Sequence, residues 1–306
     1  MITIRNVTLE GPDLSGKSTL MKNLHSATNN KYNIIDRSLM STLVYSTLYK
    51  RNDIKVRRKQ LRDSLNNLND KTIVLMPPIT ALVDRYKDRG DEIQKWEDII
   101  EIYKIYTDVL DEFQNYSTVC VVDQALDEDQ LVTYVEDYLK QSENNIPLQV
   151  QKNMSASNGE AFPVSFEVDL GTGFMKSNID ALDHEPEKEY YTKILSKMLT
   201  TIIRENIGDN PYNTPQQSLT TRRYIYTDDT CIALFHMMYR KDRLNFFATL
   251  RSSDTINIFE YDYKFLLYLC GQCASAVGLK DYEIPNETTL KVTINSAHRI
   301  DEHAKL

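Results

Sequence analysis

The feature that most constrains this chain is a complete phosphate-binding loop close to its N-terminus. Residues 11–18 read Gly-Pro-Asp-Leu-Ser-Gly-Lys-Ser, the pattern G-x-x-x-x-G-K-[ST], and they follow a strand-like run at 2–9. In such a loop backbone N–H groups surround phosphate oxygens at a helix N-terminus, the lysine reaches the β- and γ-phosphates, and the serine ligates Mg²⁺. The pattern therefore predicts ATP and Mg²⁺ as cofactors, with Lys17 catalytic and Ser18 as the metal ligand. The expected ATP-binding residues are Gly11, Asp13, Leu14, Ser15, Gly16, Lys17, Ser18 and Thr19.

Length and charge narrow the remaining possibilities. A chain of 306 residues is longer than one hydrophobic core usually serves, so we expect two domains. The net charge of −8 disfavours a surface devoted to nucleic acid, although a local basic patch stays possible. No apolar run approaches the roughly 20 residues that span a bilayer, and no signal-peptide pattern precedes the first strand. We therefore expect a cytoplasmic protein with no membrane partner.

The 4 cysteines do not form a disulfide framework in a chain of this length. Cys270 and Cys273 form a C-x-x-C pair without the second Cys/His pair that a structural zinc site needs, so we interpret them as helix packing.

The order of apolar patterns predicts an α/β fold. Strand-like runs at 2–9, 33–36, 72–76 and 118–122 alternate with helical spacing, as in a parallel sheet covered on both faces. The longest helical pattern runs from Trp96 to Phe113, and another, through Leu131, Val135 and Leu139, closes the domain. We expect a P-loop three-layer α/β/α domain at 1–142, a polar linker at 143–165 and an α+β domain at 166–306. The second domain should begin with a strand near 166–174, followed by a helix from Pro186 to Gly208.

The first domain resembles the thymidylate kinase group of nucleoside monophosphate kinases. The loop beginning Glu10-Gly11-Pro12-Asp13 is similar to that of the family, in which the residue matching Asp13 faces the sugar of the monophosphate. Asp36-Arg37 follows a strand and is similar to the family's Asp-Arg pair, whose arginine holds the acceptor phosphate. Phosphoryl transfer between two anions independently requires fixed cations on both sides and an acid that orients Mg²⁺ water. The alternative is that Asp36 caps a helix and Arg37 is solvated.

A second part of this resemblance is an arginine-bearing lid. Residues 76–91 are similar to the family's strand and lid, so Arg85 and Arg89 are expected to close over the transferring phosphoryl group and exclude water. The arginine segment and extra helix that the family places between the first helix and Asp36 are missing here. A basic run at 50–62 is either a solvated helix face or a compensating site for acceptor phosphates, of a mononucleotide or of DNA.

The second domain resembles the nucleotide-binding half of thymidylate synthases and deoxypyrimidylate hydroxymethylases. The residues that carry this resemblance are Arg222, Arg223, Cys231, Arg251, Ser252, Asp254, Asp262 and His298. The resemblance implies that a Cys231 thiolate adds to C6 of a pyrimidine and that Arg251 and Ser252 hold its phosphate. It also implies a homodimer through this domain, in which Arg222 and Arg223 reach the phosphate in the partner's site.

Asp262 bears on the base that this domain reads. The family carries asparagine there for uracil and aspartate for cytosine, and a carboxyl group can accept from the cytosine amino group. Asp262 therefore favours a cytosine nucleotide, with an aspartate in an exposed turn as the alternative. The domain is short, and the family's catalytic Glu, folate site and C-terminal closing segment are not recognisable, so a folate donor is implied only if the domain is active.

Taken together, the motifs predict a phosphotransferase: an ATP-dependent kinase for a deoxypyrimidine monophosphate, such as dTMP or a 5-modified dCMP or dUMP. Its second domain would bind a deoxypyrimidine monophosphate and dimerise the chain, an arrangement that suits a phage remodelling its nucleotide pool in host cytoplasm. Three alternatives stay open. They are a bifunctional protein in which Cys231 still modifies C5, a kinase for a modified base in DNA, and a non-catalytic nucleotide sensor.

Overall fold

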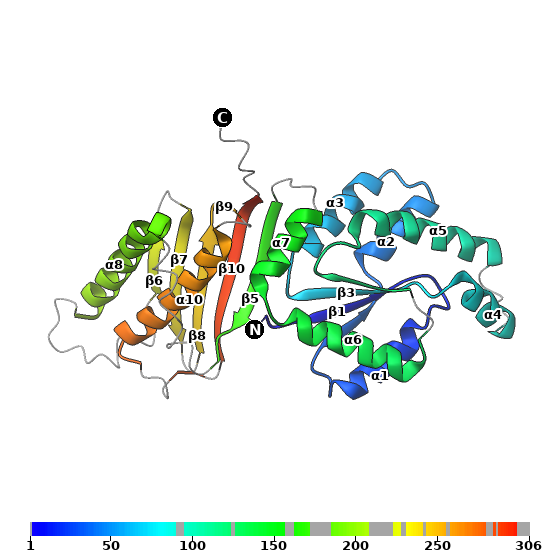
Figure 1. Ribbon diagram of the computed structural model, residues 1–306, viewed down its shortest axis with the longest axis horizontal. Helices are drawn as coiled ribbons and strands as arrows, with labels where there is room; N and C mark the ends of the chain where they lie inside the picture. Colours follow the sequence, from blue (N-terminus) through cyan, green and yellow to red (C-terminus); the bar gives the residue numbers. More distant parts are fainter. Residues whose placement is uncertain are drawn as a thin grey trace. The chain divides into compact units, whose positions relative to one another are not determined.

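The structure is a computed structural model, and the chain divides into two units, residues 2–158 and residues from 159 onward (Figure 1). It describes residues 2–89, 95–123, 126–156, 162–171, 185–207, 223–227, 231–240, 243–254, 258–279, 284–285 and 287–298.

The first unit alternates strands with helices in the order that the sequence predicts. Its elements are β1 (Asn6–Glu10), α1 (Lys17–Ala27), β2 (Asn33–Asp36), α2 (Leu39–Leu48), α3 (Ile54–Leu65), β3 (Asp70–Leu75), α4 (Ile79–Arg89), α5 (Trp96–Phe113), β4 (Val119–Val122), α6 (Glu128–Ser142) and α7 (Ile146–Ala156). The helix expected over 96–113 has those bounds, whereas the strand expected from residue 2 begins at Asn6 because Thr3 to Arg5 lie outside the ladder.

These four strands form one parallel sheet in the order β2-β1-β3-β4. The chain leaves β1 on one side to make β2 and returns across β1 to make β3, so β1 lies where the winding reverses. In open α/β sheets ligands bind beyond the carboxyl ends of the strands at such a point. The phosphate loop follows β1 directly and therefore occupies that position.

Two separate cores hold helices on the two faces of this sheet (Figure 1). On one face α1 and α6 pack together over apolar side chains that include Leu9, Leu24 and Val135. On the other face α2 packs on α3 and α5 around Val44, Tyr106 and other buried residues. Because both faces are covered, β4 (Val-Cys-Val-Val) and the second half of β3 (Ile-Val-Leu) are continuous apolar runs, as parallel strands often are.

The linker expected at 143–165 is wrong for most of its length. Residues 146–156 form α7, and residues 162–169 already belong to the first strand of the second unit. The polar composition of this segment suggested a solvated linker, but two of its polar residues are buried in α7. Gln149 accepts from Lys71 at 2.9 Å, and Asn153 accepts from the Ser117 N–H at 2.8 Å. The boundary between units consequently falls near residue 158 and not at 142.

The second unit is α+β, with a mixed sheet. Its elements are β5 (Phe162–Asp169), α8 (Glu185–Ile207), β6 (Arg223–Thr227), β7 (Ile232–Arg240), β8 (Arg243–Leu250), β9 (Ser253–Asp254), α10 (Phe259–Ala276) and β10 (Glu287–His298). The main strand order is β5-β10-β8-β7-β6, in which only the β10–β8 pairing is parallel, and the short β9 also pairs with β10 in parallel.

Alternation along these strands buries one face of the sheet. Phe235, Phe246 and Val292 are fully buried, whereas their neighbours His236, Phe247 and Lys291 are half-buried or exposed. Helices α8 and α10 pack together and lie over the same face of the sheet (Figure 1). The buried Cys270 and Cys273 lie on α10, as helix packing requires.

The predicted fold class is confirmed: a parallel sheet between two helix layers precedes an α+β unit. Among the described helices, none combines the length and apolarity needed to cross a membrane.

Candidate active site

The phosphate loop has the backbone that its glycines were predicted to provide. Gly11 has a φ of 130° and Gly16 a φ of 100°, both in the left-handed region that favours glycine. A Cβ at Gly11 would lie 2.3 Å from the Leu75 carbonyl oxygen, so no larger residue fits without moving β3. Gly16 is also the N-cap of α1, which places the helix N-terminus at the loop.

Lys17 is buried within the loop that it serves. Its Nζ donates to the carbonyl oxygens of Gly11 at 2.8 Å and Pro12 at 2.7 Å, and to Ser15 Oγ at 3.3 Å. Burial, followed by the nearby Arg37 cation, lowers the pKa of this ammonium from its ordinary value. The carboxyl groups of Asp13 and Asp36 oppose that change. A cation with few water contacts at the loop is well placed to interact strongly with phosphate oxygens.

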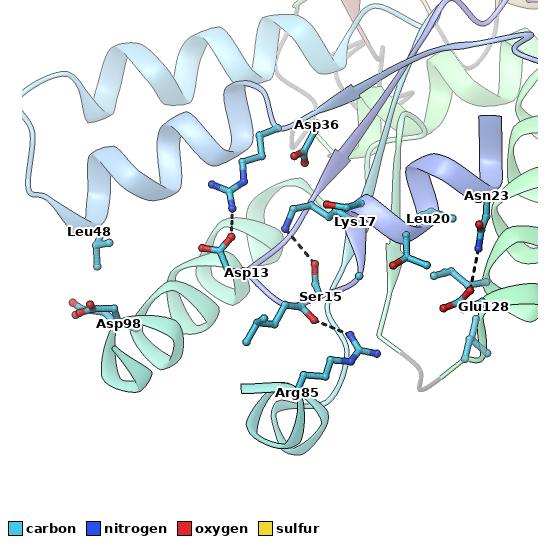
Figure 2. A pocket seen from close by; sticks show the side chains of 18 of the residues that line it. Asp13, Ser15, Lys17, Leu20, Asn23, Asp36, Leu48, Arg85, Asp98 and Glu128 are labelled. Carbon is cyan, nitrogen blue, oxygen red and sulfur yellow. Dashed lines mark hydrogen bonds and ion pairs between the residues drawn. The ribbon is translucent and has the colours of Figure 1, made fainter. Parts of the chain in front are cut away.

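Asp13 and Arg37, both predicted site residues, form an ion pair (Figure 2). The Arg37 guanidinium also donates to Tyr45 Oη at 3.2 Å and lies 5.6 Å from the centre of its ring. Arg37 has a φ of 64°, which is uncommon for a residue with a side chain. Its N–H donates to the Leu9 carbonyl at 2.9 Å, which helps to hold this backbone. The alternative of a solvated Arg37 does not describe this residue.

Arg85 of α4 also reaches the phosphate loop. Its Nη1 donates to the Leu14 carbonyl oxygen at 2.8 Å, and Figure 2 shows Arg85 reaching toward the loop near Ser15. Arg89 ends α4, but its side chain lies outside the described residues, as do Gly90 and Asp91. Of the two predicted lid arginines, only the side chain of Arg85 is described, and its closure over a phosphoryl group stays a prediction.

One cavity of about 1030 Å³ brings these groups together. Its lining includes the predicted residues Asp13, Leu14, Ser15, Gly16, Lys17, Ser18, Thr19, Asp36, Arg37 and Arg85. Ligand pockets typically measure roughly 300–1,000 Å³, so this one is large. Its charged centre combines three cations, from Lys17, Arg37 and Arg85, with two carboxylates.

The cavity extends to either side of this centre (Figure 2). One arm runs along α1 past Leu20 and Asn23 to Glu128 of α6, where Asn23 donates to Glu128 at 3.2 Å. The opposite arm runs to Leu48 at the end of α2 and to Asp98 in the first turn of α5. Tyr49, with 61% of its surface exposed, and Glu101 also line the cavity.

Sequence reasoning missed the residues of both arms. Leu48 and Tyr49 were available as apolar residues at the end of a helix, yet nothing local distinguishes them from packing residues. Asp98 matches the acidic first turn that any helix favours, and Glu101 lies one turn further along α5, so only the tertiary structure shows that both line a cavity.

The basic run at 50–62, which the structure describes throughout, does not line this cavity. Arg57 pairs with Asp53, while Arg58 and Arg62 both pair with Glu112 of α5. Arg51 differs, because it shares a separate groove with Arg37 and lies 5.5 Å from the centre of the Tyr49 ring. The structure thus favours a solvated, internally paired helix face for most of the run.

In the second unit, three of the predicted residues converge. The Arg251 N–H donates to the Cys231 carbonyl at 2.7 Å, and the charge of the Asp262 carboxyl contributes to a raised pKa of the Cys231 thiol. Asp262 is 2% exposed on α10, and accepts from Tyr191 Oη and Ser253 Oγ, each at 2.9 Å. Asp262 is therefore not in an exposed turn.

Burial controls both titratable groups of this cluster. It raises the pKa of Asp262 to about 6, although the hydroxyls of Tyr191 and Ser253 act in the opposite direction. Cys231 is an exposed residue, yet partial desolvation of its thiol, together with the Asp262 and Glu187 carboxyls, raises its pKa. The environment thus favours the thiol over the nucleophilic thiolate.

The other predicted residues of this unit are more scattered. Asp254 is buried on β9, where it pairs in register with His298, whose side chain is outside the described part. Arg222 also lies outside the described residues, and of Arg223 only the backbone is described. Arg223 pairs with Met238, which is seven residues along the chain from Cys231, or about 23 Å at 3.3 Å per residue. Within one chain its backbone is therefore far from Cys231.

No protein-family model matches this chain, and no curated protein does. Parts of it are similar to solved structures of the two kinds that the motifs resemble. The YorR protein from Bacillus subtilis, in complex with phosphorylated GDP, has 20% identity over 44% of this chain and 95% of that one, with a TM-score of 0.36. Thymidylate kinase from Candida albicans has 14% identity over 47% of this chain and 94% of that one, with a TM-score of 0.36. Thymidylate synthase from T4 phage has 12% identity over 47% of this chain and 69% of that one, with a TM-score of 0.28. These similarities are distant, so the functional argument rests on the residues of this chain.

Proposed function

We propose that the first unit is an ATP-dependent deoxynucleoside monophosphate kinase, with a deoxypyrimidine monophosphate as acceptor. The observation that supports it is a single cavity lined both by Lys17 of the phosphate loop and by Arg37, a second cation from another strand end. Two anions that exchange a phosphoryl group need positive charge on both sides of the transferring group. Ser18 at the start of α1 would hold Mg²⁺, whose charge would offset the phosphates, and Asp36 would orient its water.

The two arms suit the two substrates. Because the triphosphate would run from Lys17 past Ser18 and Thr19, the arm along α1 toward Glu128 would hold the ATP nucleoside. Arg37 stands at the entrance of the other arm, so its guanidinium would hold the acceptor phosphate while Leu48 and Tyr49 contact the base. Arg85 already touches the loop and would stabilise the transferring phosphoryl group.

A product survey tests this function. Protein and Mg-ATP are incubated with each deoxynucleoside monophosphate, including 5-hydroxymethyl and uracil forms, and products are separated by ion exchange. We expect one acceptor to give a diphosphate and Lys17→Ala to lower the rate by at least about 100-fold, because a fixed charge at the reacting group is lost. Lys22→Ala, an exposed lysine on the same helix, is the matched control and should keep the activity. No diphosphate from any mononucleotide would overturn the proposal and favour DNA as acceptor, or nucleotide sensing.

For the second unit we propose binding of a deoxypyrimidine monophosphate, with dimerisation of the chain. Supporting this are the convergence of Cys231, Arg251 and Asp262 and the half-buried outer face of the sheet, which carries His236 stacked on Phe247. A raised thiol pKa at Cys231 favours binding over C5 modification. Binding of deoxycytidine monophosphate by the full chain, compared with residues 1–158, tests the proposal.

A further inference from the structure

The first unit holds a carboxyl group that is fully buried. Glu10 is the last residue of β1, directly before the phosphate loop, and its side chain is 0% exposed. A buried carboxylate is costly unless its oxygens are hydrogen-bonded. The reaction chemistry proposed above gives Glu10 no role, so its contacts require a separate explanation.

The contacts show that Glu10 caps a helix from a distance. Its Oε1 accepts from the Ser38 N–H at 2.7 Å and from the Ser41 N–H at 3.1 Å. Ser38 is the N-cap of α2 and Ser41 its third residue, and the Ser38 side chain makes no capping bond. These two N–H groups are the pair that a capping box satisfies locally. Here one carboxyl group from β1, 28 residues earlier than the cap, satisfies both.

The other oxygen connects the same group to α5. Glu10 Oε2 accepts from the hydroxyl of Ser41 and from Tyr106 Oη, the latter at 3.0 Å. Burial is the largest cause that raises the pKa of the Tyr106 hydroxyl, and the Glu10 carboxyl adds to it. Tyr106 therefore stays protonated and able to donate. One side chain thus joins β1, α2 and α5.

Arg37 is the residue immediately before this cap. The backbone of Arg37 has a φ of 64°. Its N–H donates to the Leu9 carbonyl, and the next N–H along the chain, that of Ser38, donates to the Glu10 carboxyl. Left-handed backbone at a residue with a Cβ persists only when the surroundings impose it. Leu9 and Glu10 are also the residues that lead into the phosphate loop. Both groups that hold the Arg37 backbone therefore belong to β1.

We propose that Glu10 is a positioning residue, which sets the place of Arg37 relative to the phosphate loop and so aligns acceptor with donor. This inference rests on the proposed kinase function. It assigns to Glu10 no contact with either substrate. Its loss should therefore weaken the acceptor side and leave the ATP side nearly unchanged, since Lys17 is held by the carbonyl oxygens of Gly11 and Pro12.

A bisubstrate compound measures this alignment without turnover. Adenosine joined through five phosphates to thymidine or to deoxycytidine fills both arms only if they are correctly spaced, and its affinity is compared with that of ATP. We expect Glu10→Ala to weaken bisubstrate binding at least tenfold, because displacements of about 1 Å at a reacting site can cost about 100-fold. ATP affinity should stay within about twofold, and in turnover the acceptor KM should rise while the ATP KM does not.

Glu10→Gln should restore most of the affinity. Its amide oxygen can accept from both N–H groups, and its NH₂ can donate to the hydroxyls of Ser41 and Tyr106. Glu10→Asp has a side chain one methylene shorter, so its bisubstrate affinity should lie between those of Glu10→Ala and Glu10→Gln. It replaces Glu10→Ala in the comparison if that variant does not fold. Thr118→Val is the matched control. It removes another buried hydrogen bond, to the Leu65 carbonyl at 2.7 Å, just before β4, and should lower stability without changing the bisubstrate-to-ATP ratio.

The outcomes separate this inference from the function on which it rests. If the natural protein binds ATP but binds neither bisubstrate more tightly, the kinase proposal fails. If the natural protein binds one bisubstrate compound more tightly than ATP, and Glu10→Ala or Glu10→Asp has the same ratio of bisubstrate affinity to ATP affinity, then Glu10 has no positioning role. An equal loss of ATP and bisubstrate affinity in the Glu10 variants would likewise contradict it.

Discussion

At the scale of single residues, the first unit buries a lysine whose surroundings change its pKa. Lys71 on β3 is fully buried, and its Nζ donates to Gln149 Oε1 at 2.9 Å. Burial lowers the pKa of Lys71 to about 7, despite the opposing charge of Asp70. At neutral pH this amine is therefore near its titration midpoint, which is unusual for a lysine.

The stability of the protein should reflect that lysine. Between pH 7 and 10.5 the native Lys71 loses its proton while the unfolded one keeps it, so the unfolded state binds more protons and the free energy of unfolding rises with pH. From pH 7 to 9 we expect a gain of about 2 kcal/mol from this group, at 1.36 kcal/mol per pKa unit. Urea unfolding at each pH measures it.

Lys71→Met should abolish this rise and stabilise the protein at pH 7, because a buried amine is replaced by an apolar chain of similar length. Lys59→Met, at an exposed position on α3, is the control and should keep the pH dependence of the natural protein. A rise of the same size in Lys71→Met would show that another group causes it.

At the scale of elements, α7 shows how a polar sequence becomes part of a core. Asn153 donates to the Leu65 carbonyl at 3.1 Å and accepts from Ser117, while Gln149 Nε2 donates to the Ser142 carbonyl at 2.7 Å. Ile146, Val150 and Met154 are also buried, each worth about 1.5–3 kcal/mol. Helix α7 is thus an integral part of the first unit.

Truncation tests the role of α7. We expect residues 1–158 to fold cooperatively and to keep the kinase activity of the full chain. Residues 1–142 should be destabilised by several kcal/mol, a large share of the 5–15 kcal/mol typical of a domain. Circular dichroism during thermal unfolding compares the two fragments. Equal melting temperatures would mean that α7 contributes little beyond connecting the units.

At the scale of the whole molecule, the proposed functions assign one ligand site to each unit of the chain. Light scattering should give the mass of a dimer for the full chain and of a monomer for residues 1–158, since the proposed contact is the outer face of the second sheet. Equilibrium dialysis should find one more deoxycytidine monophosphate bound per full chain than per fragment. Asp262→Asn should weaken that extra binding about tenfold, because the amide cannot accept through both of its polar atoms.

Either a monomeric full chain or an equal stoichiometry for chain and fragment would contradict the proposal for the second unit. Neither result would alter the proposal for the first unit, whose cavity is lined only by residues of that unit.

The sequence by itself determined those features whose physics is local. The phosphate loop, the four parallel strands and the helix from Trp96 to Phe113 follow from glycine geometry and from apolar periodicity within short windows. Strand ends also placed Asp36 and Arg37 near the loop, because carboxyl ends of parallel strands share one edge.

Only the tertiary structure decided what depends on partners distant in sequence. Glu10 caps a helix that begins 28 residues later, Lys71 meets Gln149 78 residues on, and Arg58 is neutralised by Glu112. Tyr49 and Asp98 become cavity walls only when α2 and α5 pack together. Such pairings leave no periodic trace, since a buried polar side chain and a solvated one look the same until the fold brings their partners into place.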